Sequence, residues 1–94
     1  MTFKVMIRRR VPAGKAKEAN DLFARLRMLA NSQEGYTSGE TLRNVEDPED
    51  ILTISTWQSL EAWGNWFTSR QRQEIQAEVD LLLGSRTTYA VYRH

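Results

Sequence analysis

Residues 51–67, ILTISTWQSLEAWGNWF, constrain the fold most, because their hydrophobic periodicity changes abruptly within one segment. The first part is rich in Ile, Leu and Thr, which is typical of a pleated strand that ends at Trp57. Ser59 then offers a helix N-cap, since its hydroxyl can accept a hydrogen bond from a free backbone N–H. The segment therefore predicts a strand followed at once by a helix.

Large rings lie on one face of this predicted helix. At 100° per residue, four apolar side chains occupy roughly a third of its circumference: Leu60, Trp63, Trp66 and Phe67. Burying one such side chain contributes roughly 1.5–3 kcal/mol, so the helix must lie against other apolar groups. The rings either fill the core or wall an apolar pocket. Trp66, at the edge of the stripe, is expected at the pocket mouth.

The rest of the chain supplies further elements in sequence. Residues 2–10 alternate with the period of a strand, and residues 36–43 form a second strand that Gly39 weakens or bulges. The polar residues 44–50 connect this strand to its antiparallel neighbour. The longest helix is predicted over residues 13–31. Met28 lies opposite its apolar stripe, so this side chain is either exposed or in contact with a second subunit.

The last third of the chain predicts a second helical segment, which continues the ring-bearing helix, and one more strand. Thr68 or Ser69 can cap the helix, and Gly84 ends it before a strand over residues 86–92. The whole order is strand, helix, strand, strand, helix, strand. This order predicts an α+β, ferredoxin-like βαββαβ fold with a four-stranded antiparallel sheet and its helices on one face.

The other face of this sheet is expected to pack against a second copy of the chain. It combines Lys4 and Arg8 with Met6, and apolar residues on both faces of a sheet indicate that both faces are covered. We therefore predict a homodimer that pairs sheet against sheet, a dimeric α/β barrel. At 94 residues, the chain is expected to be a single domain spanning 1–94.

Composition excludes several classes of partner. With 13 Lys and Arg against 12 Asp and Glu, the formal charge of +1 predicts no nucleic acid as the main partner. No cysteine, export signal or long apolar run occurs, so we expect a soluble, cytoplasmic protein without a membrane partner. The basic residues near the start are expected to form a solvated rim: Lys4, Arg8, Arg9, Arg10, Lys15 and Lys17.

Known catalytic motifs are missing from the sequence. It has no Gly-rich phosphate loop, no Ser-His-Asp set and no HExxH, and we expect no metal site. The carboxylates of residues 46–50 are interpreted as a solvated turn. The run RQRQE, residues 70–74, is interpreted as the exposed start of a helix.

The chain resembles the antibiotic biosynthesis monooxygenase family over essentially its whole length. The resemblance is carried by VPAGK (residues 11–15), EGY (34–36), DPED (47–50) and TWQSLEAW (56–63). It implies a dimeric α+β barrel with a pocket between sheet and helices. It also implies, as in some relatives, oxidation of phenols by molecular oxygen without metal, flavin or other cofactor.

A second branch of the family opens haem, and NWFTS (residues 65–69) is similar to its helical tryptophan segment. In that branch, an iron-binding histidine lies ten residues after the tryptophan, and this chain has Gln76 at that position. That branch also has an asparagine on the first strand, where this chain has Ile7. Glutamine is a poor iron ligand, and the only histidine is the final residue, His94. We therefore do not expect haem degradation.

Two functions remain open at this point. The first is a cofactor-independent monooxygenase acting on an aromatic or quinone-like small molecule. Its base would be a carboxylate, Tyr36 or Tyr89, or the substrate's own acidity would suffice. The second is a non-catalytic dimer that binds a small ligand or serves a structural role. The catalytic residues are unknown. The expected substrate-binding residues are Trp63, Trp66, Phe67, Phe23 and Tyr36 as apolar walls and Asn65, Arg70 and Arg86 as polar contacts.

Overall fold

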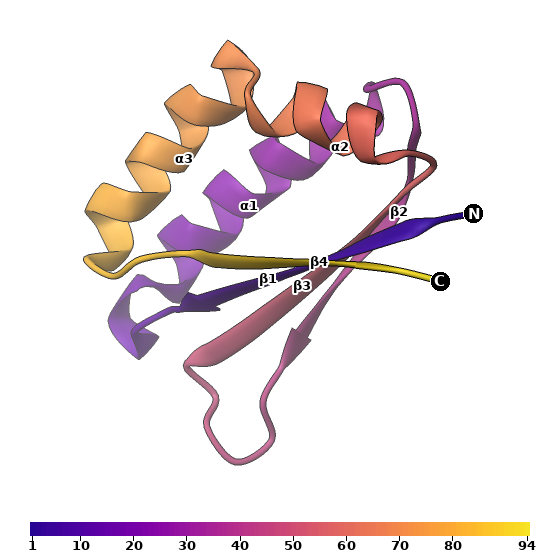
Figure 1. Ribbon diagram of the computed structural model, residues 1–94. Coiled ribbons are helices and arrows are strands. Elements are labelled where there is room, and N and C mark those ends of the chain that lie inside the picture. Colours follow the sequence, from indigo (N-terminus) through magenta and orange to yellow (C-terminus); the bar gives the residue numbers. More distant parts are fainter.

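The computed structural model describes residues 1–94 and contains one antiparallel sheet of four strands (Figure 1). The strands are β1 (Phe3–Arg10), β2 (Tyr36–Arg43), β3 (Asp50–Trp57) and β4 (Thr88–Arg93). Their order in the sheet is β2-β3-β1-β4. The connection between β2 and β3 joins antiparallel neighbours, as the short polar segment predicts. The ferredoxin-like fold expected from the sequence is confirmed.

Three α-helices cover the sheet: α1 (Ala16–Asn31), α2 (Leu60–Phe67) and α3 (Arg70–Leu83). A 3-10 turn, Ala13–Lys15, precedes α1. The hydroxyls of Ser59 and Ser69 accept hydrogen bonds from the backbone N–H groups of the third residues after them, so both expected caps are confirmed. Gly84 ends α3 with a φ of 67°, a left-handed conformation that glycine adopts without a steric penalty.

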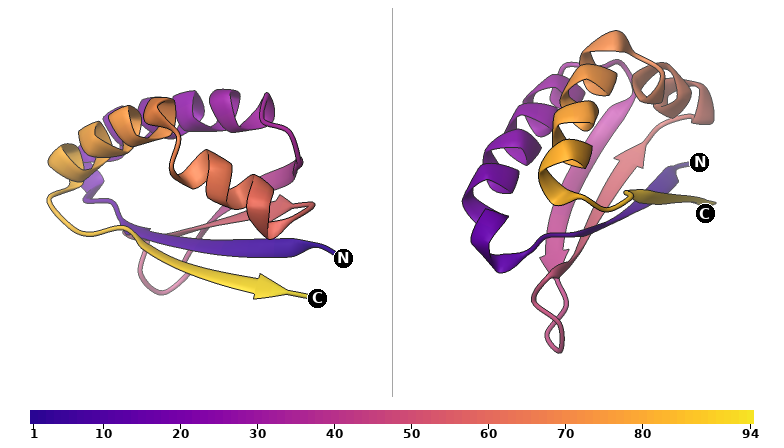
Figure 2. Two further views of the ribbon diagram at one scale, coloured as in Figure 1. Left: turned by 45° about the horizontal axis from the view of Figure 1, so that its top comes forward. Right: turned by 90° about the vertical axis from the view of Figure 1, so that its left-hand side faces the viewer.

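The helices form one layer and the sheet forms the other. Figure 2 shows α1 and α3 side by side over the sheet, with α2 crossing near the end where the termini lie. The opposite face of the sheet has no helix on it. None of the helices combines the length and the apolar character that crossing a membrane requires.

The inner face of the sheet, toward the helices, provides most of the core. Trp57 and Val5 are completely buried, and two apolar clusters fill the space between the layers. Leu60 departs from the expected stripe because it is 54% exposed. It is the first residue of α2, and only Trp63 and Trp66, later in that helix, are buried.

The expectation of a solvated basic rim is wrong at one residue. Arg8 and Arg10 are exposed, but Arg9 between them is only 7% exposed. Alternate residues of a strand face opposite sides of a sheet, so Arg9 shares the inner face with Val5 and Ile7. The alternation of side chains that places Val5 and Ile7 in the core therefore also places Arg9 in the interior.

The irregularity expected at Gly39 lies two residues earlier. The register of β2 against β3 shifts between Tyr36 and Ser38, while Gly39 pairs normally with Ser55. A Cβ atom on Gly39 would lie 2.5 Å from the hydroxyl of Tyr36. The glycine therefore leaves room for this hydroxyl against the sheet.

Candidate functional site

A small cavity lies between the inner face of the sheet and the helices, with a volume of about 70 Å³. Pockets for drug-sized ligands typically measure about 300–1,000 Å³, so this cavity is smaller than a typical ligand pocket. The cavity is lined by residues from every strand and every α-helix. They are Ile7, Arg9, Phe23, Leu26, Arg27, Ala30, Tyr36, Gly39, Glu40, Thr41, Thr53, Ser55, Trp57, Trp63, Trp66, Arg72 and Tyr89.

All three tryptophans of the chain line this cavity. Trp57 stands edge-on to Tyr36 and to Trp63, with ring centroids 5.2 and 5.8 Å apart. Such edge-to-face pairs contribute about 0.5–1.5 kcal/mol each beyond burial. Trp63 and Trp66 also belong to the core cluster. The two alternatives for the rings, core or pocket wall, are therefore both realised by the same side chains.

The predicted wall residues separate into two groups. Four of them, Phe23, Tyr36, Trp63 and Trp66, line the cavity. Trp66 is 5% exposed, so it lies inside the protein and not at a solvent-facing mouth, because its side chain points from α2 into the core. Phe67 instead lies at the surface, 36% exposed, and lines a separate groove.

This groove, of about 560 Å³, runs between α3 and β4. Besides Phe67, it is lined by Asp80, Arg86 and Thr87, and it shares Arg72 and Tyr89 with the cavity. The predicted polar contact Arg86 therefore faces the groove.

The other predicted polar contacts, Asn65 and Arg70, line neither hollow and are exposed. The guanidinium of Arg70 pairs with Glu74 on the surface, 3.4 Å away.

Arg72 corrects the expectation that residues 70–74 are the exposed start of a helix. It is 6% exposed, and its guanidinium donates hydrogen bonds to the carbonyl oxygen of Phe67, at 3.0 Å, and to the hydroxyl of Tyr89. It also lies over the Phe67 ring, 4.4 Å from the centroid. A signal was present in the sequence: Arg72 is three residues before Ile75 and seven before Val79, on the same buried stripe of α3.

Arg9 is the second buried arginine of the cavity. One of its terminal nitrogens donates a hydrogen bond to the side-chain oxygen of Gln76, at 3.2 Å, and its guanidinium lies 4.7 Å from the Phe23 ring centroid. Burial lowers the pKa of Arg9 to about 10, while the nearby Tyr89 opposes this shift. A pKa of about 10 leaves Arg9 positively charged at neutral pH.

Gln76 is held in a fixed orientation beside Arg9. Its side-chain nitrogen donates hydrogen bonds to a carboxylate oxygen of Asp80, at 2.9 Å, and to the hydroxyl of Thr87, at 3.0 Å. The Asp80 carboxylate only accepts hydrogen bonds and therefore requires the amide nitrogen, whereas Arg9 only donates, so the amide oxygen faces Arg9. The position that holds a histidine in the haem-opening branch here anchors a buried arginine.

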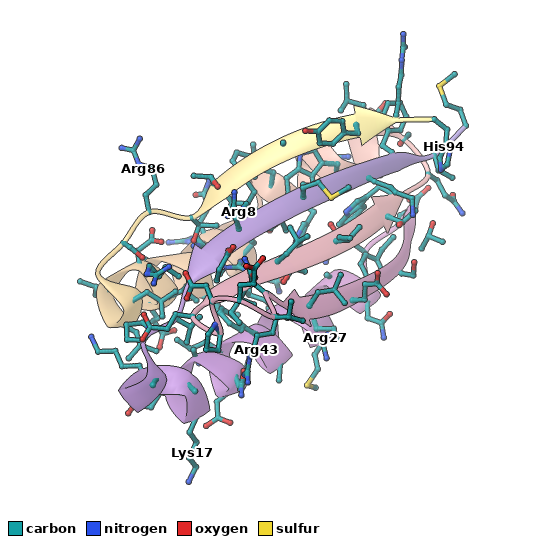
Figure 3. All side chains as sticks on the ribbon, turned by 90° about the horizontal axis from the view of Figure 1, so that it is seen from below. Arg8, Lys17, Arg27, Arg43, Arg86 and His94 are labelled. Carbon is teal, nitrogen blue, oxygen red and sulfur yellow. The ribbon has the colours of Figure 1, made fainter.

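Proton-accepting groups are scarce in the cavity. Burial raises the pKa of Tyr36 and of Tyr89 above the ordinary value of 10.0, so both hydroxyls are protonated donors at neutral pH. Glu40 is the only carboxylate on the lining, and it is exposed. His94 lies at the end of the sheet far from Arg86 (Figure 3). The cavity therefore lacks a buried side chain that could act as a general base at neutral pH.

Comparison with known proteins connects this architecture to one family. The family model described as antibiotic biosynthesis monooxygenase matches residues 2–78. None of the curated proteins matches the chain.

Solved structures share the fold at low sequence identity. A conserved protein from Methanosarcina mazei Go1 superposes with a TM-score of 0.90 at 20% identity, covering 99% of this chain and 92% of the other. SnoaB, a cofactor-independent oxygenase from Streptomyces nogalater, gives 0.87 at 17% identity, with 99% and 92% covered. A Mycobacterium tuberculosis protein gives 0.86 at 14% identity, with 100% and 95% covered.

Proposed function

The chain belongs to the antibiotic biosynthesis monooxygenase family, and on that premise we propose that it is a cofactor-independent monooxygenase acting on an aromatic or quinone-like small molecule. The observation that carries this proposal is the cavity walled by Trp57, Trp63 and Trp66 between the sheet and the helices. The similarity to SnoaB, itself a cofactor-independent oxygenase, agrees with it.

The reaction uses the reducing power of the substrate. An electron-rich phenolate transfers one electron to O₂, and recombination of the resulting radicals forms a carbon–oxygen bond as a hydroperoxide. Loss of water then produces a carbonyl, so one oxygen atom enters the product and the other leaves as water. The protein has to orient the ring, exclude bulk water and stabilise the anion. The tryptophan walls provide the first two of these functions.

The size of the cavity limits how a substrate can reach it. About 70 Å³ does not accommodate a polycyclic ring system. Arg72 and Tyr89 line both the cavity and the groove of about 560 Å³, so they form the partition between the two hollows. Separating these two side chains would join the hollows, and we propose this as the access route for substrate.

Oxygen consumption tests the proposed reaction. An oxygen electrode would follow uptake with a panel of hydroquinones, anthrones and related phenols, and we expect uptake above background with at least one of them. Trp66→Phe keeps an apolar ring but enlarges the cavity, so uptake should fall by about tenfold, since loose positioning alone has effects of this order or larger. Leu81→Ala is the matched control, because Leu81 is 85% exposed on α3.

A non-catalytic binding module is the second candidate function, and the absence of a general base in the cavity favours it. It predicts no oxygen uptake with any member of the panel and no difference between Trp66→Phe and Leu81→Ala. It also predicts saturable binding of an aromatic ligand. Uptake that depends on Trp66 would rule it out.

We also propose that two copies of the chain pair through the uncovered face of the sheet. This face presents apolar side chains from all four strands: Met6, Leu42, Leu52, Ile54, Ala90 and Tyr92. An apolar sheet face of this kind needs a cover. Light scattering should show a dimer for the native chain and a monomer for Ile54→Glu, which places a charge at its centre. A monodisperse native monomer at micromolar concentration would contradict the pairing.

A further inference from the structure

The cavity contains two buried arginines, and the one carboxylate on its lining, Glu40, is exposed and forms no ion pair with them. Arg9 and Arg72 are 7% and 6% exposed and both line the cavity. The ion pairs of this chain involve other arginines, all at the surface. A buried charge is costly unless a counter-charge or a full set of hydrogen bonds compensates it. The pair of arginines is therefore an unusual feature of a small core.

The hydrogen bonds of both guanidinium groups end on neutral acceptors. Arg9 donates to the amide oxygen of Gln76, and its Nε is buried without any partner. Arg72 donates to a backbone carbonyl and to the hydroxyl of Tyr89. A guanidinium has five N–H donors, and its geometry matches an oxyanion. The donors of Arg9 in particular are not all used within the protein.

Carboxylates of the chain are not placed to fill this role. Asp80 is near enough to oppose the lowering of the Arg9 pKa, but it forms no ion pair with Arg9 and instead accepts a hydrogen bond from the nitrogen of Gln76. Glu40 is exposed on β2 and makes no ion pair. A negative charge in direct contact with either guanidinium would therefore have to come from outside the chain.

We propose that the cavity binds an aromatic oxyanion, a phenolate or a carboxylate, with its charged oxygen held by Arg9 and Arg72 and its ring against the tryptophans. Naming this anion as the substrate rests on the proposed function, whereas the binding site itself rests on the two arginines. The arrangement also explains how a phenol ionises without a base: two adjacent positive charges lower the pKa of a bound phenol. Arg9 and Arg72 thus replace Asn65, Arg70 and Arg86 as the polar contacts.

Binding of an anion would also change the partition between the hollows. Arg72 is joined to Tyr89, and these two residues separate the cavity from the groove. A full negative charge competes for the guanidinium more strongly than a neutral hydroxyl does, since hydrogen bonds between charged partners are about twice as strong as neutral ones. The ligand can therefore displace the Tyr89 hydroxyl and take its place.

A matched pair of ligands tests charge recognition directly. Benzoate and benzamide have nearly the same shape, but only benzoate carries a charge. Because every tryptophan lines the cavity, their fluorescence reports occupancy without background from elsewhere in the chain. We expect benzoate to bind about tenfold or more tightly than benzamide, the size of effect that charge-assisted hydrogen bonds produce.

A second measurement tests the phenolate form with 4-nitrophenol, whose anion is coloured. Protein that prefers the anion should increase the ionised fraction of bound 4-nitrophenol at a fixed pH near its own pKa. Arg9→Met and Arg72→Met should each remove most of this increase and most of the preference for benzoate. Arg8→Met is the control, because Arg8 lies on β1 but faces away from the cavity. Circular dichroism would verify that each variant is folded.

The outcomes separate this inference from the oxygenase proposal. Equal affinity for benzoate and benzamide in the native protein would overturn the anion site, whatever the variants do. So would a preference for benzoate that survives in folded Arg9→Met and Arg72→Met. Benzoate is not oxidised by this chemistry, so selective binding without oxygen uptake would support the anion site and refute the oxygenase. Oxygen uptake without any preference for anions would support the oxygenase and refute the anion site.

Discussion

Three consecutive arginines on β1 experience two different environments. Arg8 and Arg10 face the open side of the sheet, where Arg8 pairs with Asp50 at 2.9 Å and Arg10 pairs with Asp47 at 2.9 Å. Figure 3 views this side and shows Arg8 on it. Arg9 faces the helices, is buried and has no carboxylate partner.

The difference shows which of these charges serves the fold. On the outer face, Asp47 of the connection between β2 and β3 and Asp50 at the start of β3 compensate the arginines, and water is available as well. On the inner face, a charge costs stability, and no carboxylate of the chain forms an ion pair with Arg9. Hydrophobic packing would be the more stable choice at position 9, and the buried charge there agrees with the proposed role of Arg9 in binding.

The largest contrast between the two faces should appear in hydrophobic packing. Trp57 is completely buried on the inner face, and its indole N–H donates to the Ser55 hydroxyl at 3.1 Å. Trp57→Ala should lower the free energy of unfolding by about 3–5 kcal/mol. Tyr92→Ala, at a 58% exposed ring on the outer face, should change it by less than about 1 kcal/mol.

Urea unfolding at a concentration where the chain is monomeric would measure both changes. Similar losses for the two variants would show that the outer face is packed as tightly as the inner one, and the contrast would fail.

The next effect concerns the buried charge and has the opposite sign. Burial lowers the pKa of Arg9 from 12.5 to about 10, so the folded state disfavours its charged form. Replacing it by methionine removes this penalty but leaves the Gln76 oxygen without its donor, and the net effect should be a gain of about 1–3 kcal/mol. Arg8→Met should change the stability by less than about 1 kcal/mol.

Thermal unfolding monitored by circular dichroism would compare these two variants. A clear loss of stability in Arg9→Met would mean that Arg9 mainly supports the fold, and its proposed role in binding would lose this argument.

The smallest effect should come from the acidic residues of the outer face. A hydrogen bond from Arg10 lowers the pKa of Asp47, and hydrogen bonds from Asn44 and then Arg8 lower the pKa of Asp50, both from an ordinary value of 3.8. A carboxylate with a depressed pKa in the folded state stabilises the protein above pH 3.8, and this contribution disappears as the pH falls through the lower value.

Thermal melts below pH 4 should therefore show a modest decline that Asp47→Asn combined with Asp50→Asn removes. Arg9→Met should retain the native decline, because the carboxyl groups with a depressed pKa lie on the outer face and pair with Arg8 and Arg10. If the double variant lost as much stability below pH 4 as the native protein does, Asp47 and Asp50 would not be the cause of the decline.

Local signals in the sequence were sufficient for the elements of the fold. The serine hydroxyls before α2 and α3 and the glycine after α3 act within a single turn, so Ser59, Ser69 and Gly84 could be assigned without knowledge of the rest of the molecule. The alternation of apolar residues likewise placed β1 and the inner face of the sheet. Each of these features depends on neighbours within about four residues in the chain.

The site required information of another kind. Phe23, Tyr36, Trp63 and Trp66 were identified because they are apolar and periodic. Arg9 and Arg72 were assigned to the surface because arginine is seldom buried without a partner, although their positions follow the same strand and helix periods. For these two arginines, the residue type predicted exposure and the position in the strand or helix predicted burial. The structure agrees with the position.

The sequence alone determined the order of strands and helices, their caps and the side of each element that faces the core, because short-range hydrogen bonding and periodicity decide these. Only the tertiary structure decided that β1 and α3 bring two guanidinium groups into one cavity beside Tyr89. Arg9 and Arg72 are far apart in the chain, and their surroundings arise from the packing of separate elements. Burying these charges costs free energy only because that packing excludes water from around them, so the sequence alone does not show the cost.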